Sequence, residues 1–151
     1  MITSFLLSLA GLAISGYLTY AHFQPRAMVC ADSGVVNCGL VTTSAQSYFL
    51  GVPVAVLGLV QYGAMTALTS PWAWRSPLYA LHVARAALAA VGMGFVLWLV
   101  AAELLIIDHI CLWCTGVHVV TFALLVVLAR VAPAQLGWVA TGGSGSDARA
   151  R

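Results

Sequence analysis

Long apolar stretches alternate with short polar segments along this chain of 151 residues. Residues 2–23, 51–68, 78–102 and 107–128 are almost wholly apolar. A helix needs about 20 such residues to cross a bilayer. The pattern therefore predicts four transmembrane helices, joined by one substantial polar loop and by shorter turns.

The longest connection, residues 24–47, is polar and follows the first predicted helix. Within it, Ser44 is expected to cap a short helix over residues 45–50, because a serine oxygen at that position can accept an unpaired backbone N–H. This half-helix is expected to lie at the membrane interface. Pro53 fits the first turn of the second transmembrane helix, where proline is well tolerated.

Composition supports the same fold class. Hydrophobic residues make up 62% of the chain and charged residues only 7%, against roughly 25% charged residues in a soluble domain. We therefore expect an all-α integral membrane protein, with one four-helix domain over residues 1–132 and a flexible, glycine- and serine-rich tail over residues 133–151. The chain has no lysine and a net charge of only +2, which argues against nucleic-acid binding.

Arginine placement predicts the orientation in the membrane. Basic residues favour the cytoplasmic side, and three arginines fall on one side of the four-helix pattern: Arg75, Arg85 and Arg130. Arg85 is expected to snorkel from the start of the third helix to the surface. Both termini are then cytoplasmic, and the polar loop faces outward. The lysine-free, arginine-rich composition favours a bacterial plasma membrane.

Four cysteines fall on the outward side in this orientation. Cys30 and Cys38 form a C-x7-C pair in the loop, whereas Cys111 and Cys114 form a C-x2-C motif where the fourth helix begins. A helix N-terminus lowers the pKa of a thiol and favours thiolate attack. The pattern favours thiol–disulfide exchange, with no metal. The alternatives are a four-cysteine zinc site, which usually has two short C-x2-4-C knuckles, and two inert structural disulfides.

His118 shares a predicted helix face with both cysteines of the C-x2-C motif, because the three positions are related as i, i+3 and i+7. A histidine inside a transmembrane helix is costly and marks a functional site by default. We expect it to donate a hydrogen bond to a quinone carbonyl; the alternative is a bond to a neighbouring helix. An apolar quinone slot is expected to be lined by Trp113, Phe49 and Phe122.

These residues resemble the vitamin K epoxide reductase family in its bacterial, freestanding form. The resemblance covers residues 15–22, the loop cysteines, Ser44, residues 51–53 and the Cys-Leu-Trp-Cys sequence of residues 111–114. The loop pair precedes the C-x2-C motif, whereas the DsbB family has the reverse order. The resemblance implies a four-helix membrane fold and a thiol oxidoreductase without a fused thioredoxin domain.

The resemblance also implies a role for each cysteine. Cys30 is similar to the outer shuttle cysteine that exchanges with a separate, DsbA-like thioredoxin-fold partner. Cys38 is similar to the inner shuttle cysteine, which attacks the helix disulfide at Cys111. Cys114 is similar to the cysteine that reacts with the quinone, here menaquinone or ubiquinone.

Two further residues match the quinone pocket of the family. Ser44 corresponds to a hydroxyl near the quinone, and His118 stands where vertebrate members carry a tyrosine that hydrogen-bonds the quinone. An asparagine that adds a second bond in vertebrate members has no clear counterpart here. The expected activity is quinone-dependent reoxidation of the partner. Reduction of quinone epoxides and a non-catalytic subunit with structural disulfides remain as alternatives.

Overall fold

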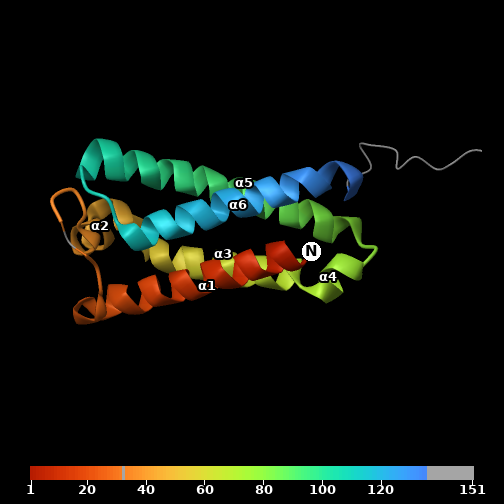
Figure 1. Cartoon of the computed structure of the whole chain (residues 1–151), viewed down its shortest axis with the longest axis horizontal. Coiled ribbons are helices and arrows are strands. Elements are labelled where there is room, and N and C mark those ends of the chain that lie inside the picture. Colours follow the sequence, from red (N-terminus) through yellow and green to blue (C-terminus); the bar gives the residue numbers. More distant parts are fainter. Residues whose placement is uncertain (32, 136–151) are drawn as a thin grey trace, which may run out of the picture.

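Four long helices form the body of the molecule, and they run side by side (Figure 1). The computed structural model describes residues 1–31 and 33–135. The long helices are α1 (Ile2–Phe23), α3 (Val54–Thr69), α5 (Tyr79–Ala102) and α6 (Leu112–Gln135). Helix α1 packs against α3 and α6, and α5 packs against the same two helices. The predicted all-α fold with four apolar helices is confirmed.

The four helices differ in length. Three described segments are long and apolar enough to cross a membrane: Ile2–Phe23, Tyr79–Ile107 and Leu112–Pro133. Helix α3 has 16 residues and so measures about 24 Å at 1.5 Å per residue, somewhat less than the roughly 30 Å hydrocarbon core. Helix α6 ends at Gln135, and the rest of the predicted tail lies outside the described residues.

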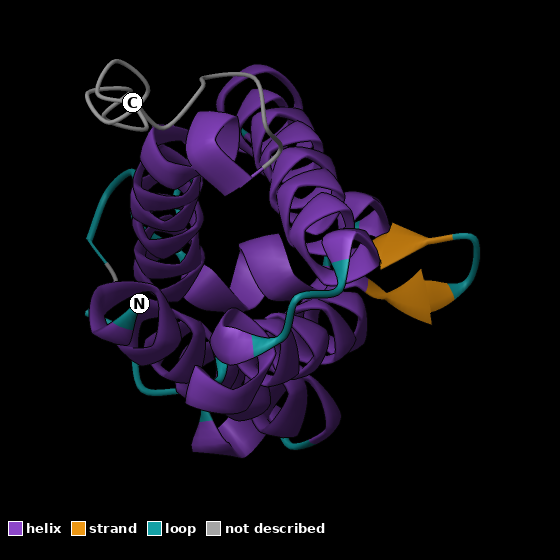
Figure 2. Cartoon of the chain, turned by 90° about the vertical axis from the view of Figure 1, so that its right-hand side faces the viewer, coloured by secondary structure: helices purple, strands orange, loops and turns teal. Residues whose placement is uncertain are grey.

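The short elements are gathered in the connections. Those between α1 and α3 are η1 (Pro25–Ala27), α2 (Cys38–Thr43), η2 (Ala45–Ser47), β1 (Tyr48–Phe49) and β2 (Val52–Pro53). Helix α4 (Pro71–Arg75) follows α3, and the π-helical turn η3 (Glu103–Ile107) follows α5. Strands β1 and β2 pair antiparallel and form a small hairpin that projects from the bundle (Figure 2).

The short helix of the loop lies earlier than predicted. Helix α2 starts at Cys38, where the Asn37 side chain caps it by accepting a hydrogen bond of 2.9 Å from the Leu40 N–H. Ser44 is not its N-cap but its C-cap, and the Ser44 hydroxyl donates to the Val41 carbonyl at 2.8 Å. Ser44 also stands at the N-cap position of η2, but its side chain makes no capping hydrogen bond there and the turn ends at Ser47. The predicted capped helix over residues 45–50 is therefore reduced to a single 3-10 turn.

Backbone conformation explains why the 3-10 turn η2 does not continue to residue 50. Leu50 and Gly51 have φ values of 52° and 82°, in the left-handed region that ends helices and makes tight turns. This turn reverses the chain between β1 and β2. The second membrane helix consequently starts at Val54, three residues later than the apolar pattern indicates.

Close packing fills the half of the bundle that carries the N-terminus. Its buried apolar cluster consists of Tyr62, Met65, Ala89, Leu124 and Leu128. Helices α1 and α3 approach closely there, because a side chain at Gly11 would overlap the Tyr62 ring. The Tyr62 hydroxyl is bonded to that of Thr121 at 2.7 Å. This half of the bundle is therefore tightly packed, whereas the cysteine end is more open.

Arg85 does not snorkel to the surface. Its side chain is 1% exposed, and its Nη2 donates to the Leu68 carbonyl at 2.7 Å. The guanidinium carbon lies 4.0 Å from the centre of the Trp74 ring, at a distance typical of a cation–π contact. The prediction failed because α4 and the end of α3 fold over the start of α5 and offer these partners.

Candidate redox site at the cysteine end of the bundle

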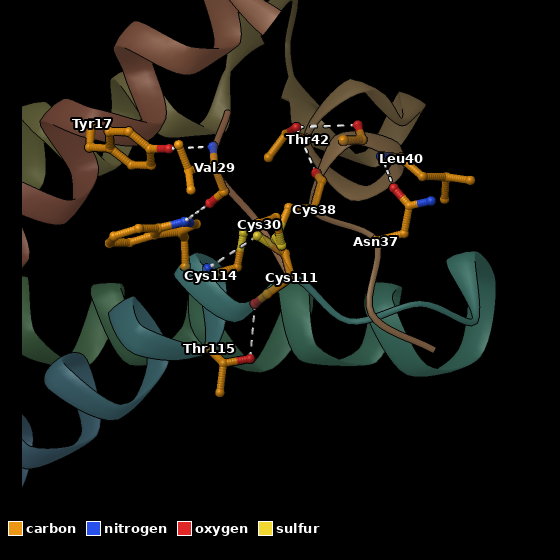
Figure 3. Close-up of a disulfide and its surroundings, with 12 residues drawn as sticks. Tyr17, Val29, Cys30, Asn37, Cys38, Leu40, Thr42, Cys111, Cys114 and Thr115 are labelled. Atoms are coloured by element: carbon orange, nitrogen blue, oxygen red, sulfur yellow. Dashed lines mark hydrogen bonds between the residues drawn. A yellow bond between two sulfur atoms is a disulfide. The ribbon is translucent and has the colours of Figure 1, made fainter. Parts of the chain in front are cut away.

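The four cysteines gather at one end of the bundle, where α2 lies beside the start of α6 (Figures 1 and 3). Cys30 and Cys38 form a disulfide with a Cα–Cα distance of 6.1 Å, and Cys111 and Cys114 are free thiols. Cys38 and Cys111 are buried in one cluster, and the other two cysteines pack against it. The structure therefore brings together the two pairs that are more than 70 residues apart in the sequence.

Backbone pairing fixes the loop pair next to the helix pair. Val36 and Ile110 form a parallel bridge, and the Ile110 N–H and carbonyl bond to the loop backbone at 2.9 and 3.1 Å. Asn37, which donates the second of these bonds, directly precedes Cys38, and Ile110 directly precedes Cys111. Because the paired segments run parallel, Cys38 and Cys111, which follow the bridged residues, lie side by side.

Trp113 and Tyr17 fix the loop backbone next to Cys30 through hydrogen bonds. The Trp113 indole N–H donates to the Val29 carbonyl at 2.8 Å, and the Val29 N–H donates to the Tyr17 hydroxyl at the same distance. The two rings lie 4.5 Å apart. Val29 precedes Cys30, so these bonds position the outer cysteine (Figure 3).

Trp113, which was predicted to line a quinone slot, does not line the cavity that the structure contains. Its side chain turns toward α1 and is absent from the lining of the cavity described below. Phe122 does not line that cavity either and is exposed on the bundle surface, whereas Phe49 does line it. The indole N–H explains the difference, since it finds its acceptor in the loop backbone rather than in the bundle interior.

Cys111 occupies the N-terminus of α6. Its carbonyl accepts the Thr115 N–H at 2.9 Å, and its sulfur accepts the Cys114 N–H at 3.3 Å. Hydrogen bonds from the Cys114 thiol, and then from the Cys114 backbone, hold the pKa of the Cys111 thiol below its usual range despite burial. A sulfur of low pKa is a good leaving group in disulfide exchange.

A cavity of about 590 Å³ lies between the helices beneath the cysteines. This volume is within the range of small-molecule sites, which are mainly apolar with a few placed polar groups. The lining is mostly aliphatic; its side chains able to hydrogen-bond include His22, Ser44, Gln61, Glu103, His118 and Thr121. Val60 on α3 and Val91 on α5 also line it and are 66% and 58% exposed, so the cavity reaches the outer surface between these helices.

Cys114, His118 and Ser44 all line this cavity. His118 lies one helical turn below Cys114 and is buried, and its Nε2 has no hydrogen-bond partner among the described residues. A buried polar atom without a partner is uncommon and calls for an explanation, such as a ligand. The cavity thus has a reactive sulfur and a free hydrogen-bonding nitrogen on one helix.

Glu103 belongs to the same site, although its position in the sequence indicates only an outer turn. It is 6% exposed and lines the cavity. Its carboxyl group lies near enough to Cys111 and Cys114 to interact electrostatically with both. The sequence does contain a signal, because four apolar residues follow Glu103 before the turn, and an acid inside an apolar span is by default functional.

Two cysteine pairs in contact, one of them beside an apolar cavity in a membrane bundle, define a membrane thiol–disulfide oxidoreductase. Residues 2–129 match the Vitamin K epoxide reductase family, and the chain belongs to this family. A search of curated proteins gave no match. Members of the family are quinone-reducing thiol oxidoreductases, so this multi-pass membrane protein is a quinone-dependent enzyme of that type. The resemblance seen in the sequence is confirmed at the level of the family.

Proposed function

We propose that this enzyme reoxidises a separate, DsbA-like thioredoxin-fold protein and passes the electrons through its two cysteine pairs to menaquinone or ubiquinone. The observation that carries the proposal is the exposure of the four sulfurs. Cys30 is half-buried at the loop surface, Cys38 and Cys111 are buried against each other, and Cys114 faces the cavity. This order leads from a protein-accessible sulfur to a ligand-accessible one.

The exchange steps follow from that order. The partner's two thiols reduce the Cys30–Cys38 disulfide and leave as a disulfide. The Cys38 thiolate then attacks Cys111 in a Cys111–Cys114 disulfide and releases Cys114 as a thiol. Cys30 attacks Cys38 next, which re-forms the loop disulfide and releases Cys111, whose lowered pKa favours its departure. The structure, with a loop disulfide and two free thiols on the helix, has the bonding pattern of this product.

The last step transfers two electrons and two protons from Cys111 and Cys114 to the quinone, giving a quinol and a helix disulfide. In this proposal Cys114 is the sulfur next to the quinone, because it is the cysteine that lines the cavity. His118 Nε2 bonds one quinone oxygen. The Ser44 hydroxyl, now bonded to the Val41 carbonyl, also lines the cavity and in this proposal bonds near the quinone ring.

Replacement of His118 by alanine is expected to raise the apparent KM for quinone by about 2- to 13-fold, since one net hydrogen bond contributes about 0.5–1.5 kcal/mol. His118→Gln keeps a donor and should raise the KM less. Quinol formation at varied quinone concentration measures both values. His82→Ala is a suitable control, because His82 lies on α5 at the other end of the bundle and does not line the cavity. An unchanged KM in His118→Ala would assign His118 to packing alone.

We further propose that the cysteine end faces outward from a bacterial plasma membrane, with both termini in the cytoplasm. Arg75 is the last residue of α4 at the opposite end of the bundle, Arg130 lies in the last part of α6, and Arg85 contacts α3 and α4 there. Positive residues favour the cytoplasmic side. The outward side would also supply the oxidising space in which disulfides persist.

The proposed function is tested with the purified enzyme in lipid nanodiscs that contain menaquinone or ubiquinone. A reduced DsbA-like protein serves as the electron donor. We expect one partner disulfide and one quinol per turnover, with no partner oxidation in quinone-free discs. Consumption of vitamin K epoxide with no quinone-dependent oxidation of the partner would instead indicate an epoxide reductase, and the absence of both reactions would contradict catalysis.

A further inference from the structure

We infer that Glu103 is a catalytic acid–base residue that takes the proton of the Cys114 thiol and passes it to the quinone; the inference rests on the proposed function. The chemical problem is general, because each thiol must lose a proton and each quinone oxygen must gain one in a site away from water. A carboxylate beside the sulfur can accept the proton of the thiol and then donate it to the quinone oxygen.

Three placements carry the inference. The Glu103 side chain is almost fully buried. It lines the same cavity as Cys114. Its carboxyl group also lies near enough to the start of α6 to interact electrostatically with both cysteines of the C-x2-C motif.

No cation in the described lining neutralises this carboxyl group. The described lining contains no arginine, and the chain contains no lysine at all. A buried carboxylate without an ion pair is costly, and within a membrane it is an expected mark of a proton pathway. Its presence beside the C-x2-C motif is therefore better explained by proton transfer than by structural pairing.

The other titratable side chains that line the described cavity are His22 on α1, Tyr62 on α3, and Cys114 and His118 on α6. Both His22 ring nitrogens already have partners, in the Thr42 carbonyl and the Tyr48 hydroxyl. The Tyr62 hydroxyl is bonded to α6. His118 is assigned to the quinone oxygen, which leaves Glu103 as the base in the described lining that is available to the Cys114 thiol.

The backbone conformation at Glu103 directs its side chain into the bundle. Glu103 opens the π-helical turn η3, and Asp108 ends that turn with a left-handed φ of 56°. Single π turns inside α-helices occur frequently at functional sites. Here the turn keeps Glu103 inside the bundle, while Leu104, Leu105 and Ile106 are exposed on the outer surface.

The step balances as follows. The Cys114 thiol gives its proton to the Glu103 carboxylate, and the Cys111 thiol loses its proton as the new disulfide bond forms between the two sulfurs. Of the four electrons in the two broken S–H bonds, two form the S–S bond and two reduce the quinone, which takes up two protons. One of these comes from Glu103, which returns to its carboxylate form, and the other is the proton released from Cys111.

The test compares Glu103→Gln and Glu103→Asp with the wild-type enzyme in quinone-containing nanodiscs. General acid–base groups typically contribute about 100-fold or more, so Glu103→Gln should lower the kcat for quinol formation by about that factor. Glu103→Asp keeps the carboxyl group and should recover part of the loss. The acidic limb of the kcat–pH profile should also disappear in Glu103→Gln. Asp108→Asn is the matched control, because Asp108 is an exposed acid whose left-handed conformation asparagine tolerates.

A second readout separates proton transfer from a structural role. The rate of Cys114 alkylation by a small maleimide is followed by site-resolved mass spectrometry between pH 6 and pH 9, with quinone absent. Glu103→Gln removes a negative charge beside the sulfur and so favours the thiolate; Cys114 should therefore be alkylated faster than in the wild-type enzyme while quinol formation falls.

Parallel loss of alkylation and quinol formation in Glu103→Gln would overturn the inference and indicate misfolding of the site. Unchanged quinol formation with an unchanged pH profile would overturn it as well. Failure of the wild-type enzyme to reduce either quinone would refute the proposed function. The alkylation profiles then decide the role of Glu103 independently, since identical profiles in the two proteins would exclude a proton-accepting contact with Cys114.

Discussion

Replacement of Cys114 by serine is expected to lower quinol formation by more than roughly 1,000-fold, the scale on which loss of a reacting nucleophile acts. Cys114 is the cysteine that lines the cavity, and without it no helix disulfide can form. The Cys30–Cys38 disulfide does not depend on Cys114, so its first exchange with a reduced partner should survive. Quinol absorbance reports the loss, and a burst of one partner disulfide per enzyme reports the surviving step.

Val119→Ala is the control for the Cys114 variant, since Val119 lies on the same helix but is 62% exposed and does not line the cavity. It should retain normal turnover. Multiple turnovers in Cys114→Ser would contradict the assignment of Cys114, and would direct attention to Cys111 as the sulfur that serves the quinone.

Replacement of Cys30 by serine is expected to trap a Cys38–Cys111 disulfide as the main species. Cys38 can still attack the helix disulfide, but the sulfur that would release Cys111 is missing. The parallel bridge between Val36 and Ile110 keeps Cys38 next to Cys111, which is the arrangement that this attack requires. Mass spectrometry of peptides from enzyme that has been oxidised through quinone and digested without reductant measures the link.

A double variant, Cys30→Ser with Cys38→Ser, should show no such cross-link and is the matched control. A dominant Cys38–Cys114 link would reverse the proposed order of the helix cysteines. Complete absence of any cross-link between the pairs would mean that electrons do not pass between them, and the relay would have to be abandoned.

The periodic features of the fold could be predicted from the sequence. Four apolar stretches predicted the long helices, and the C-x7-C and C-x2-C patterns placed both pairs at one end of the bundle. His118 was found because helical spacing alone sets it on the face of Cys114. These features depend on residue type and on the spacing of residues along one helix, and both can be read from a single sequence.

Contacts between distant segments could not be predicted in the same way. Trp113 turns away from the cavity because Val29, 84 residues earlier, offers an acceptor. Arg85 is buried because the Leu68 carbonyl and the Trp74 ring meet it. The short helix starts at Cys38 because Asn37 supplies the cap, and Glu103 turns inward because of the π turn that follows α5.

The position of the cavity opening has a kinetic consequence. The exposed side chains of Val60 and Val91 border the cavity where the bundle surface would meet lipid. A hydrophobic acceptor that enters there comes from the bilayer. The concentration that sets its rate of binding is therefore its mole fraction in the lipid and not its amount per volume of water. Diluting the discs should then leave the turnover rate per enzyme unchanged at a fixed quinone-to-lipid ratio. The protein donor, which approaches from the aqueous side, should show the ordinary dependence on molarity.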